Sequence, residues 1–177
     1  AKTHLNIYSD TSQDSYILQL VKASLSLTEK YLGEHLFDTT VEFYIPELKS
    51  TVLPHKGAKS ITSVKYIDSS DIEQTWDSSN YYLEDRTEHK SLKVTDGATL
   101  PTDISTTRDN PIMVTYQTNY WDYLVGDSST EAEDLRIAVL MYVGEIFSGR
   151  DNTSSKGISR LPLCSERLLT PYKRIVL

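Results

Sequence analysis

Two amphipathic helical patterns, separated by a long segment of β pattern, constrain the fold of this chain more than any other feature of its sequence. The first runs from about Ser12 to Leu32 and is followed by Gly33, which readily takes the left-handed conformation found at helix ends. The second runs from about Thr130 to Ser148. Between them lie short segments rich in Val, Ile, Thr and Tyr, separated by turn residues. The pattern predicts an α+β fold: a small helical bundle core with an inserted antiparallel β-sheet region and an extended C-terminal tail.

The same pattern divides the chain into three parts. Residues 1–38 and 120–150 are expected to form the helical core, and residues 39–119 the inserted β region, as a meander-like sheet or a small barrel. Within that region, Asp68 to Asp71 has the composition of a hairpin turn. Residues 151–177 are expected to be a linker followed by the tail.

Each predicted helix carries two apolar faces, and each face needs something to pack against. In the first helix, one face comprises Leu18, Val21, Leu25 and Leu32, and the other comprises Tyr16, Leu20, Ala23, Leu27 and Tyr31. In the second helix, one face comprises Leu135, Val139, Tyr142 and Ile146, and the other comprises Ile137, Leu140, Met141 and Gly144. The second face of each helix has two interpretations: it packs in the chain's own core, or it contacts a neighbouring subunit.

The composition argues against several kinds of site. The one cysteine, Cys164, has no partner for an internal disulfide, and the four histidines lack metal-ligand spacing, so neither a metal nor a cofactor is expected. A formal net charge of -7 argues against a general nucleic-acid binder, which needs a basic face. The sequence has neither a membrane-length apolar run nor a signal-peptide pattern, so we expect a soluble protein made in a cytoplasm.

No catalytic constellation is visible in the sequence. The chain lacks a phosphate-binding glycine loop, a nucleophile elbow and a His-Glu-x-x-His motif. Acidic pairs such as Glu73 with Asp77, or Glu84 with Asp85, have the chemistry of a glycoside hydrolase, but 25 acidic residues produce such pairs by chance. We therefore expect no enzyme and no catalytic residues.

Tyrosine is the dominant aromatic residue, with 12 copies. Three aromatic residues lie together at the expected end of a strand: Tyr120, Trp121 and Tyr123. Such rings have an apolar body and a polar group, so they suit a partly solvated interface. This cluster is a candidate interface, whereas Tyr116 is expected to be an ordinary packed strand residue. A β-rich module that stacks its tyrosines on glycan is the alternative function.

The C-terminal segment differs in chemistry from the rest of the chain. Residues 160–177 contain four basic residues and one acidic residue in an otherwise acidic protein, and they are rich in apolar side chains. A segment of this composition suits a partner that the rest of the chain does not bind. The alternative is that "SERLLTPY" forms a helix, ended by Pro171, and that this helix and a last strand fold onto the chain's own domain.

Taken in order, several segments resemble the head-tail connector proteins of tailed bacteriophages, also called adaptor, neck or head-completion proteins. The segments are "TEKYLG", "SITSVKYID", "EQTW", "SNYYLED", "NPIMVTYQTNYW", "EDLRIAVLMYVGEIF" with "GRDN", and "LPLCSERLLTPYKRIVL". The resemblance covers nearly the whole chain and is most specific in "SVKYID" and in the terminal "LL-x-PY-[KR]" after "LP".

The resemblance implies a structural, non-enzymatic virion protein that assembles in the host cytoplasm. Connector proteins form a ring, usually of twelve copies, under the portal of the capsid. The ring extends the DNA channel and carries the stopper, the nozzle or the tail. Phage DNA then passes through the lumen without sequence-specific binding, and acidic residues that face the lumen would keep it from adhering. The sequence does not identify these acids; neutralisation of Glu131, Glu133 and Asp134 together would test whether those three line the channel.

The resemblance also implies roles for individual residues. Inter-subunit contacts are expected from Tyr16, Leu20, Leu27, Tyr31, Ile137, Leu140 and Met141. Docking to the portal is expected from Leu161, Leu163, Leu168, Leu169, Pro171, Tyr172, Lys173, Arg174, Ile175 and Val176, together with the terminal leucine.

The energetics of such a tail predict assembly on the portal rather than a stable free ring. Burying eight apolar side chains contributes about 12 to 24 kcal/mol, whereas ordering a free tail of this length costs about 17 to 34 kcal/mol. A single tail therefore binds weakly, whereas a ring of subunits holds many tails near the portal at a high effective concentration.

A peptidoglycan hydrolase carried in the virion is a further alternative function.

Overall fold

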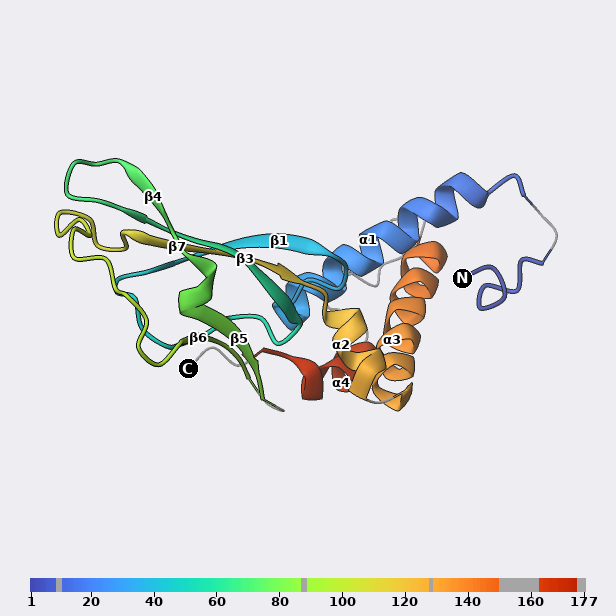
Figure 1. Ribbon diagram of the computed structural model, residues 1–177. Helices are drawn as coiled ribbons and strands as arrows, with labels where there is room; N and C mark the ends of the chain where they lie inside the picture. Colours follow the sequence, from blue (N-terminus) through green and yellow to red (C-terminus); the bar gives the residue numbers. More distant parts are fainter. Residues whose placement is uncertain (9–10, 87–88, 128, 150–162, 175–177) are drawn as a thin grey trace. The chain divides into compact units, whose positions relative to one another are not determined.

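The computed structural model describes residues 1–8, 11–86, 89–127, 129–149 and 163–174. The chain divides into two compact units, Ala1–Glu34 with Leu124–Leu177, and His35–Tyr123. The fold is α+β, as the sequence predicts: the long helices belong to the first unit and the antiparallel sheets to the second (Figure 1). We call these the helical unit and the β unit.

The helical unit is built from α1 (Asp14–Leu32), α3 (Ser129–Ser148), α4 (Leu163–Leu169) and a short 3-10 turn, η2 (Thr170–Tyr172). Helix α1 ends as predicted, because Gly33 is left-handed with φ 73° and donates its N–H to Glu29 O at 2.8 Å. Helix α3 buries Leu135, Val139 and Tyr142, three of the four residues of its predicted core face, while the fourth, Ile146, is half-buried.

The buried face of α1 differs from both predicted faces. It comprises Ile17, Leu20, Ser24, Thr28 and Leu32. Thr28 Oγ1 donates to Ser24 O at 2.9 Å, one turn earlier, so its hydroxyl is satisfied inside the helix and can be buried. Leu18, which periodicity places on a core face, is 55% exposed.

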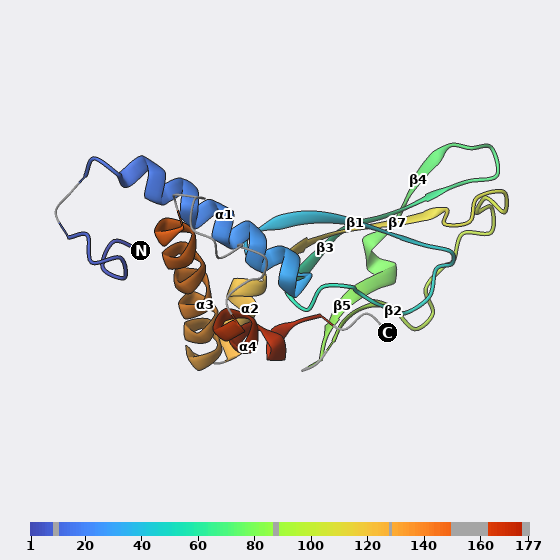
Figure 2. The same ribbon diagram turned by 180° about the vertical axis from the view of Figure 1, so that it is seen from behind.

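The described residues of the β unit form seven strands and one 3-10 turn: β1 (Thr39–Ile45), β2 (Thr51–Val52), β3 (Ala58–Ile67), β4 (Glu73–Trp76), η1 (Ser78–Asn80), β5 (Tyr81–Asp85), β6 (Lys90–Val94) and β7 (Ile112–Thr118). They form a four-stranded sheet in the order β1-β7-β3-β4 and a three-stranded sheet in the order β2-β6-β5. The last strand, β7, lies between β1 and β3, so the four-stranded sheet is not the expected meander. The strands form two separate antiparallel sheets and not one closed barrel. Figure 2 shows β2 and β5 on one side of β1, β3 and β7.

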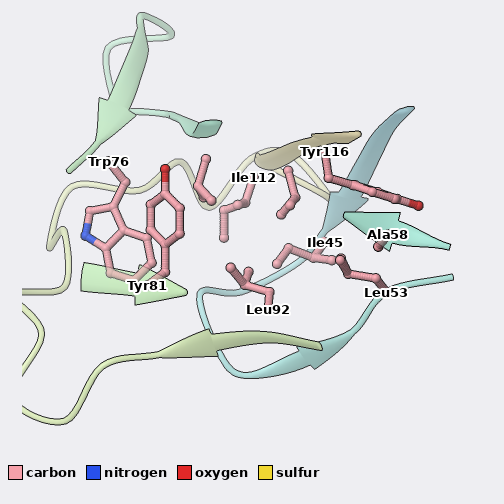
Figure 3. Close-up of a cluster of buried hydrophobic side chains, with 10 residues drawn as sticks. Ile45, Leu53, Ala58, Trp76, Tyr81, Leu92, Ile112 and Tyr116 are labelled. Atoms are coloured by element: carbon pink, nitrogen blue, oxygen red, sulfur yellow. The ribbon is translucent and has the colours of Figure 1, made fainter. Parts of the chain in front are cut away.

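The apolar core of the β unit lies between the two sheets. Its buried members come from both of them: Ile45, Leu53, Ala58, Val64, Trp76, Tyr81, Leu92, Ile112, Val114 and Tyr116. The ring centroids of Trp76 and Tyr81 are 5.5 Å apart. Figure 3 shows the two rings side by side. Tyr116 is fully buried, as its expected packing role requires, and its hydroxyl hydrogen-bonds to His55 Nδ1.

The predicted hairpin turn connects β3 to β4. Asp68 Oδ1 accepts the backbone N–H of Ser70 at 2.9 Å and that of Ile72 at 3.0 Å. Asp71 is left-handed with φ 65°, a conformation that aspartate tolerates in turns. Hydrogen bonds from Gln74, Ile72 and Ser70 hold the pKa of Asp68 below its usual value.

A close backbone approach joins the start of β3 to the end of β7. Gly57 is buried, and its carbonyl accepts the N–H of Asn119 at 2.8 Å. A Cβ atom at position 57 would lie 2.7 Å from backbone atoms of Asn119 and Tyr120. Only glycine fits at this position without movement of the backbone.

Residues after Asn119 form a helix instead of the predicted strand end. Helix α2 (Tyr120–Asp127) begins where Asn119 Oδ1 accepts the N–H of Asp122 at 2.9 Å, which is a side-chain N-cap. The backbone N–H of Tyr120 donates to His35 O at 2.9 Å. The chain thus turns into a helix as soon as β7 ends.

Candidate interaction surfaces

The described part of the C-terminal segment is folded onto the helical unit. Leu169 is fully buried, and the N–H of Arg174 donates to Leu32 O at 2.8 Å. Tyr31 OH lies 3.1 Å from Thr170 Oγ1 and 3.5 Å from Glu166 O. Residues 163–172 are helical, and this segment is anchored to α1, which agrees with the helical part of the alternative interpretation of "SERLLTPY".

This placement separates the proposed docking residues into groups. Leu169 belongs to the unit's own core, so an exposed docking role for it is wrong in this conformation. Pro171 and Lys173 are exposed, while Leu168, Tyr172 and Arg174 are half-buried. Leu161, Ile175 and Val176 lie outside the described residues, and Leu163 begins α4 without a described side chain.

The exposed surface of this segment is basic and partly aromatic. Lys173 Nζ lies 4.8 Å from the centroid of the Tyr31 ring, a cation-π geometry. Tyr172 OH donates to Asp134 Oδ2 of α3 at 3.0 Å. Arg167 is exposed on the last turn of α4. Two cationic side chains are therefore presented from a folded backbone.

The predicted inter-subunit face of α1 is only partly available. Leu27 is 37% exposed, but Leu20 is 6% exposed and packs in the core, so its assignment to an outer face is wrong. Tyr16 and Tyr31 are half-buried, and the ring centroid of Tyr16 lies 6.4 Å from that of Phe147. Leu18 and Leu27 are the exposed leucines of α1, but nine residues separate them, so they lie on opposite sides of the helix.

The predicted outer face of α3 is partly exposed. Ile137 is 45% exposed, whereas Leu140 and Met141 are half-buried. Gly144 on this helix is covered by the N-terminal segment, because a Cβ added there would lie 3.4 Å from His4 Nε2. Ile137 is therefore the best placed of the predicted α3 contacts.

The acidic residues at the start of α3 are not equivalent. Glu133 pairs with Arg136 at 3.1 Å on the exposed surface. Asp134 accepts a hydrogen bond from the Tyr172 hydroxyl. The side chain of Glu131 is not among those described.

Tyr142 is a buried tyrosine of α3. Burial raises the pKa of Tyr142 to about 12, and the charge of Glu166 adds to the effect. The Tyr142 hydroxyl therefore stays protonated over the physiological pH range.

The aromatic cluster predicted as an interface is mostly internal to the β unit. Tyr120 is 2% exposed, so its role as an interface residue is wrong. Its ring stacks on that of Tyr123, with centroids 5.6 Å apart and an interplanar angle of 13°. Tyr123 and Trp121 are half-buried. The Asn119 N-cap turns the chain here, so these rings follow helical rather than strand geometry.

The β unit contains an ion-pair cluster, Lys59 with Asp38 and Asp122, that the sequence pattern does not predict. Lys59 Nζ lies 2.7 Å from Asp122 Oδ2 and 3.2 Å from Asp38 Oδ1. Hydrogen bonds from Asn119 and Lys59 hold the pKa of Asp38 below its usual value, while Asp122 and Asp38 raise that of Lys59. Its three members are far apart in sequence, so only the fold brings them together.

The acidic pairs considered for hydrolysis are engaged in local contacts. Glu73 pairs with Lys65 at 2.7 Å, and Asp77 accepts the N–H of Ser79 at the start of η1. Glu84 pairs with Lys93, and Asp85 with Lys90. Among the described residues, no cluster of His, Cys, Asp and Glu has metal-site geometry, and no helix has the length and hydropathy needed to cross a membrane.

Comparison with known proteins gives structural matches only. No protein-family model matches the chain, and no curated protein matches it. In a neck of an empty GTA particle solved with C6 symmetry, one chain aligns with 99% of this chain and 88% of its own length, at 15% identity and a TM-score of 0.70.

Two further solved structures give similar values. A chain of the virion of a native gene transfer agent (GTA) particle aligns with 99% of this chain and 88% of its own length, at 15% identity and a TM-score of 0.67. A chain of a native GTA neck solved with C12 symmetry aligns with 99% of this chain and 89% of its own length, at 13% identity and a TM-score of 0.65. The whole chain therefore shares its fold with chains of gene transfer agent particles, two of them from the neck.

Proposed function

We propose that this protein is a structural neck component, a head-tail adaptor, of a tailed phage or a related particle. The observation that carries the proposal is a fold shared over 99% of the chain with chains of GTA necks. The ordered sequence segments that resemble connector proteins support it independently. In this role the protein works in the virion neck, assembles in the host cytoplasm and needs no catalytic residue.

The proposed assembly is a ring of twelve copies under the portal, which extends the DNA channel and carries the stopper, nozzle or tail. The exposed apolar side chains Leu27 and Ile137 suit a cyclic contact between different faces of neighbouring subunits. Because these side chains are 37% and 45% exposed, complete burial of what remains contributes about 0.6 to 1.4 kcal/mol each. The net charge of -7 per copy gives a twelve-copy ring an acidic character that does not hold DNA.

For the portal contact, we propose the surface of α4 and η2 rather than an unfolded tail. Residues 163–174 are already folded against α1 and α3, so their backbone entropy is not lost on binding. Arg167 and Lys173 face outward and suit acidic groups on the portal, while Leu168 and Tyr172 add apolar area. Removal of the whole segment would expose the core around Leu169, so point variants are the appropriate test.

The test is co-sedimentation of the full chain with purified portal rings. The variant Arg167→Glu with Lys173→Glu reverses both exposed charges, and Lys22→Glu reverses an exposed charge on α1 as a matched control. We expect about one copy of the wild type per portal subunit, wild-type binding by the control, and about tenfold weaker binding by the double variant. Thermal unfolding of each protein establishes that the fold is intact.

The outcomes separate the two parts of the proposal. If the double variant binds like the wild type, the connector role stands and the α4 contact is wrong. If the wild type does not bind portal rings, the connector role itself loses its support.

Ring formation has its own test, by electron microscopy of the portal-bound protein. Leu27→Asp or Ile137→Asp should prevent complete rings, because a charge is expensive to bury at a contact. Leu100→Asp, at a residue of the β unit that is 49% exposed, is the control and should form rings. Complete rings from the Leu27 and Ile137 variants would remove these residues from the contact.

A further inference from the structure

The outer face of the four-stranded sheet is polar and carries one prominent aromatic ring. Along β1, Val41, Phe43 and Ile45 turn toward the core, while Thr40, Glu42 and Tyr44 are exposed. The cross-strand register places Tyr44 opposite Met113, and Met113 opposite Lys65. Side chains of three adjacent strands therefore form one row across this face.

A pocket of about 190 Å³ opens beside this row. Its walls come from β1, β3, β4 and β7 and from the loop before β7. They include Tyr44, Lys65, Glu73, Arg108, Asn110 and Met113. All of them belong to the β unit. The volume suits one sugar ring rather than a folded partner.

Tyr44 provides a flat and positioned ring at the edge of the pocket. Its side chain is 52% exposed, although it is a large aromatic residue on a regular strand. Its hydroxyl donates to Glu42 Oε2 at 3.1 Å, two residues earlier on the same face, which holds the ring along the strand. A ring fixed in this way offers a face to the C–H groups of a ligand at little cost in side-chain entropy.

The charged side chains that line the pocket are already in ion pairs. Lys65 Nζ lies 2.7 Å from Glu73 Oε1, and Arg108 donates from two nitrogens to Asp71 Oδ1 at 3.0 and 2.7 Å. The pocket is therefore near electrical neutrality, and an anion would have to compete with the carboxylates. The paired groups and Asn110 still offer donors and acceptors to a neutral ligand with several hydroxyl groups.

We propose that this pocket binds a neutral oligosaccharide, with one sugar ring stacked on Tyr44 and its hydroxyls bonded to the Lys65–Glu73 pair, Arg108 and Asn110. An aromatic platform beside a neutral network of hydrogen-bonding groups is the chemistry that such a ligand needs. The site lies on the β unit and does not depend on the proposed neck role. If the protein forms a ring, repetition of a weak site would give avidity for a carbohydrate surface.

The experiment is an NMR titration of the labelled full chain with chitotriose and with maltotriose. We expect at least one sugar to shift the amide resonances of Tyr44, Lys65 and Met113 with millimolar affinity. Tyr44→Ala should raise the Kd about tenfold, and Glu73→Gln should weaken binding without loss of the fold. The control is Tyr82→Ala on β5, because Tyr82 is also 52% exposed but lies outside the pocket.

Three results would overturn the proposal. The first is the absence of shifts at these residues with both sugars. The second is equal weakening by the Tyr44 and Tyr82 variants, which would indicate a non-specific contact. The third is a response of the pocket to an acidic tripeptide, triglutamate, and not to either sugar, which would assign the surface to an anionic peptide.

Discussion

Replacement of Gly57 by alanine is the most direct test of the packing in the β unit. The added Cβ would lie 2.7 Å from the carbonyl carbon of Asn119 and from Tyr120 N and Cα. Ordinary carbon contacts begin at 3.4 Å, so these atoms must separate by several tenths of an ångström. They are backbone atoms, and they cannot move aside by a side-chain rotation.

The hydrogen bonds around Gly57 determine the size of the effect. Asn119 donates to Gly57 O at 2.8 Å and Tyr120 donates to His35 O at 2.9 Å, so separation stretches at least one of them. Loss of one such bond costs about 1 kcal/mol, and overpacking costs about 1 to 3 kcal/mol. We therefore expect Gly57→Ala to lower the free energy of unfolding of the β unit by about 2 to 4 kcal/mol.

Equilibrium unfolding in urea, followed by tryptophan fluorescence, measures this change. Both tryptophans, Trp76 and Trp121, belong to the β unit, so the signal reports on that unit. Gly97→Ala is the control: Gly97 has φ 80° and nothing within 4 Å of an added Cβ, so only backbone strain of about 1 kcal/mol is expected. A Gly57→Ala variant within about 0.5 kcal/mol of the wild type would refute the close-approach argument.

Three further predictions follow from single contacts. Leu169→Ala should destabilise the helical unit by about 2 to 5 kcal/mol because it leaves a cavity under α4, and a thermal unfolding scan monitored by circular dichroism measures it. Asn119→Ala should cost about 1 kcal/mol through loss of the α2 N-cap, and the tryptophan unfolding assay should detect it. The folded pKa of Asp68 is lowered, so its contribution to stability is present above its unfolded pKa of about 3.9 and is lost as the pH falls through the folded value. Asp68→Asn should therefore weaken the acid dependence of the urea midpoint below about pH 4, and an unchanged profile would contradict the role of the turn bonds.

The sequence predicts the elements whose signals are local. Helix α1 ends at Gly33 because a single residue supplies the left-handed conformation, and the β3–β4 turn follows from the side chain of Asp68. The core face of α3 follows from its periodicity. None of these features needs a partner distant in sequence, so each is visible in the amino-acid pattern.

The features missed by sequence reasoning depend on distant partners. The burial of Leu20 rather than Leu18 is set by what packs on α1, and periodicity alone does not distinguish the two faces. Helix α2 depends on the cap at Asn119, whose surrounding sequence also fits a strand end. The carbohydrate pocket joins β1 to β3 through β7, a register that no local pattern encodes.

The chain connectivity of the two units has a consequence for the order of folding during synthesis. The β unit is one continuous segment, His35–Tyr123, and it can fold as soon as that segment has left the ribosome. The helical unit closes through contacts such as that between Tyr31 and Glu166, which are 135 residues apart. Helix α1 is thus made before the β unit but is packed only after it, when α3 and α4 have followed. Conditions that slow translation of the segment after Tyr123 should therefore prolong the interval in which the apolar side chains of α1 are uncovered.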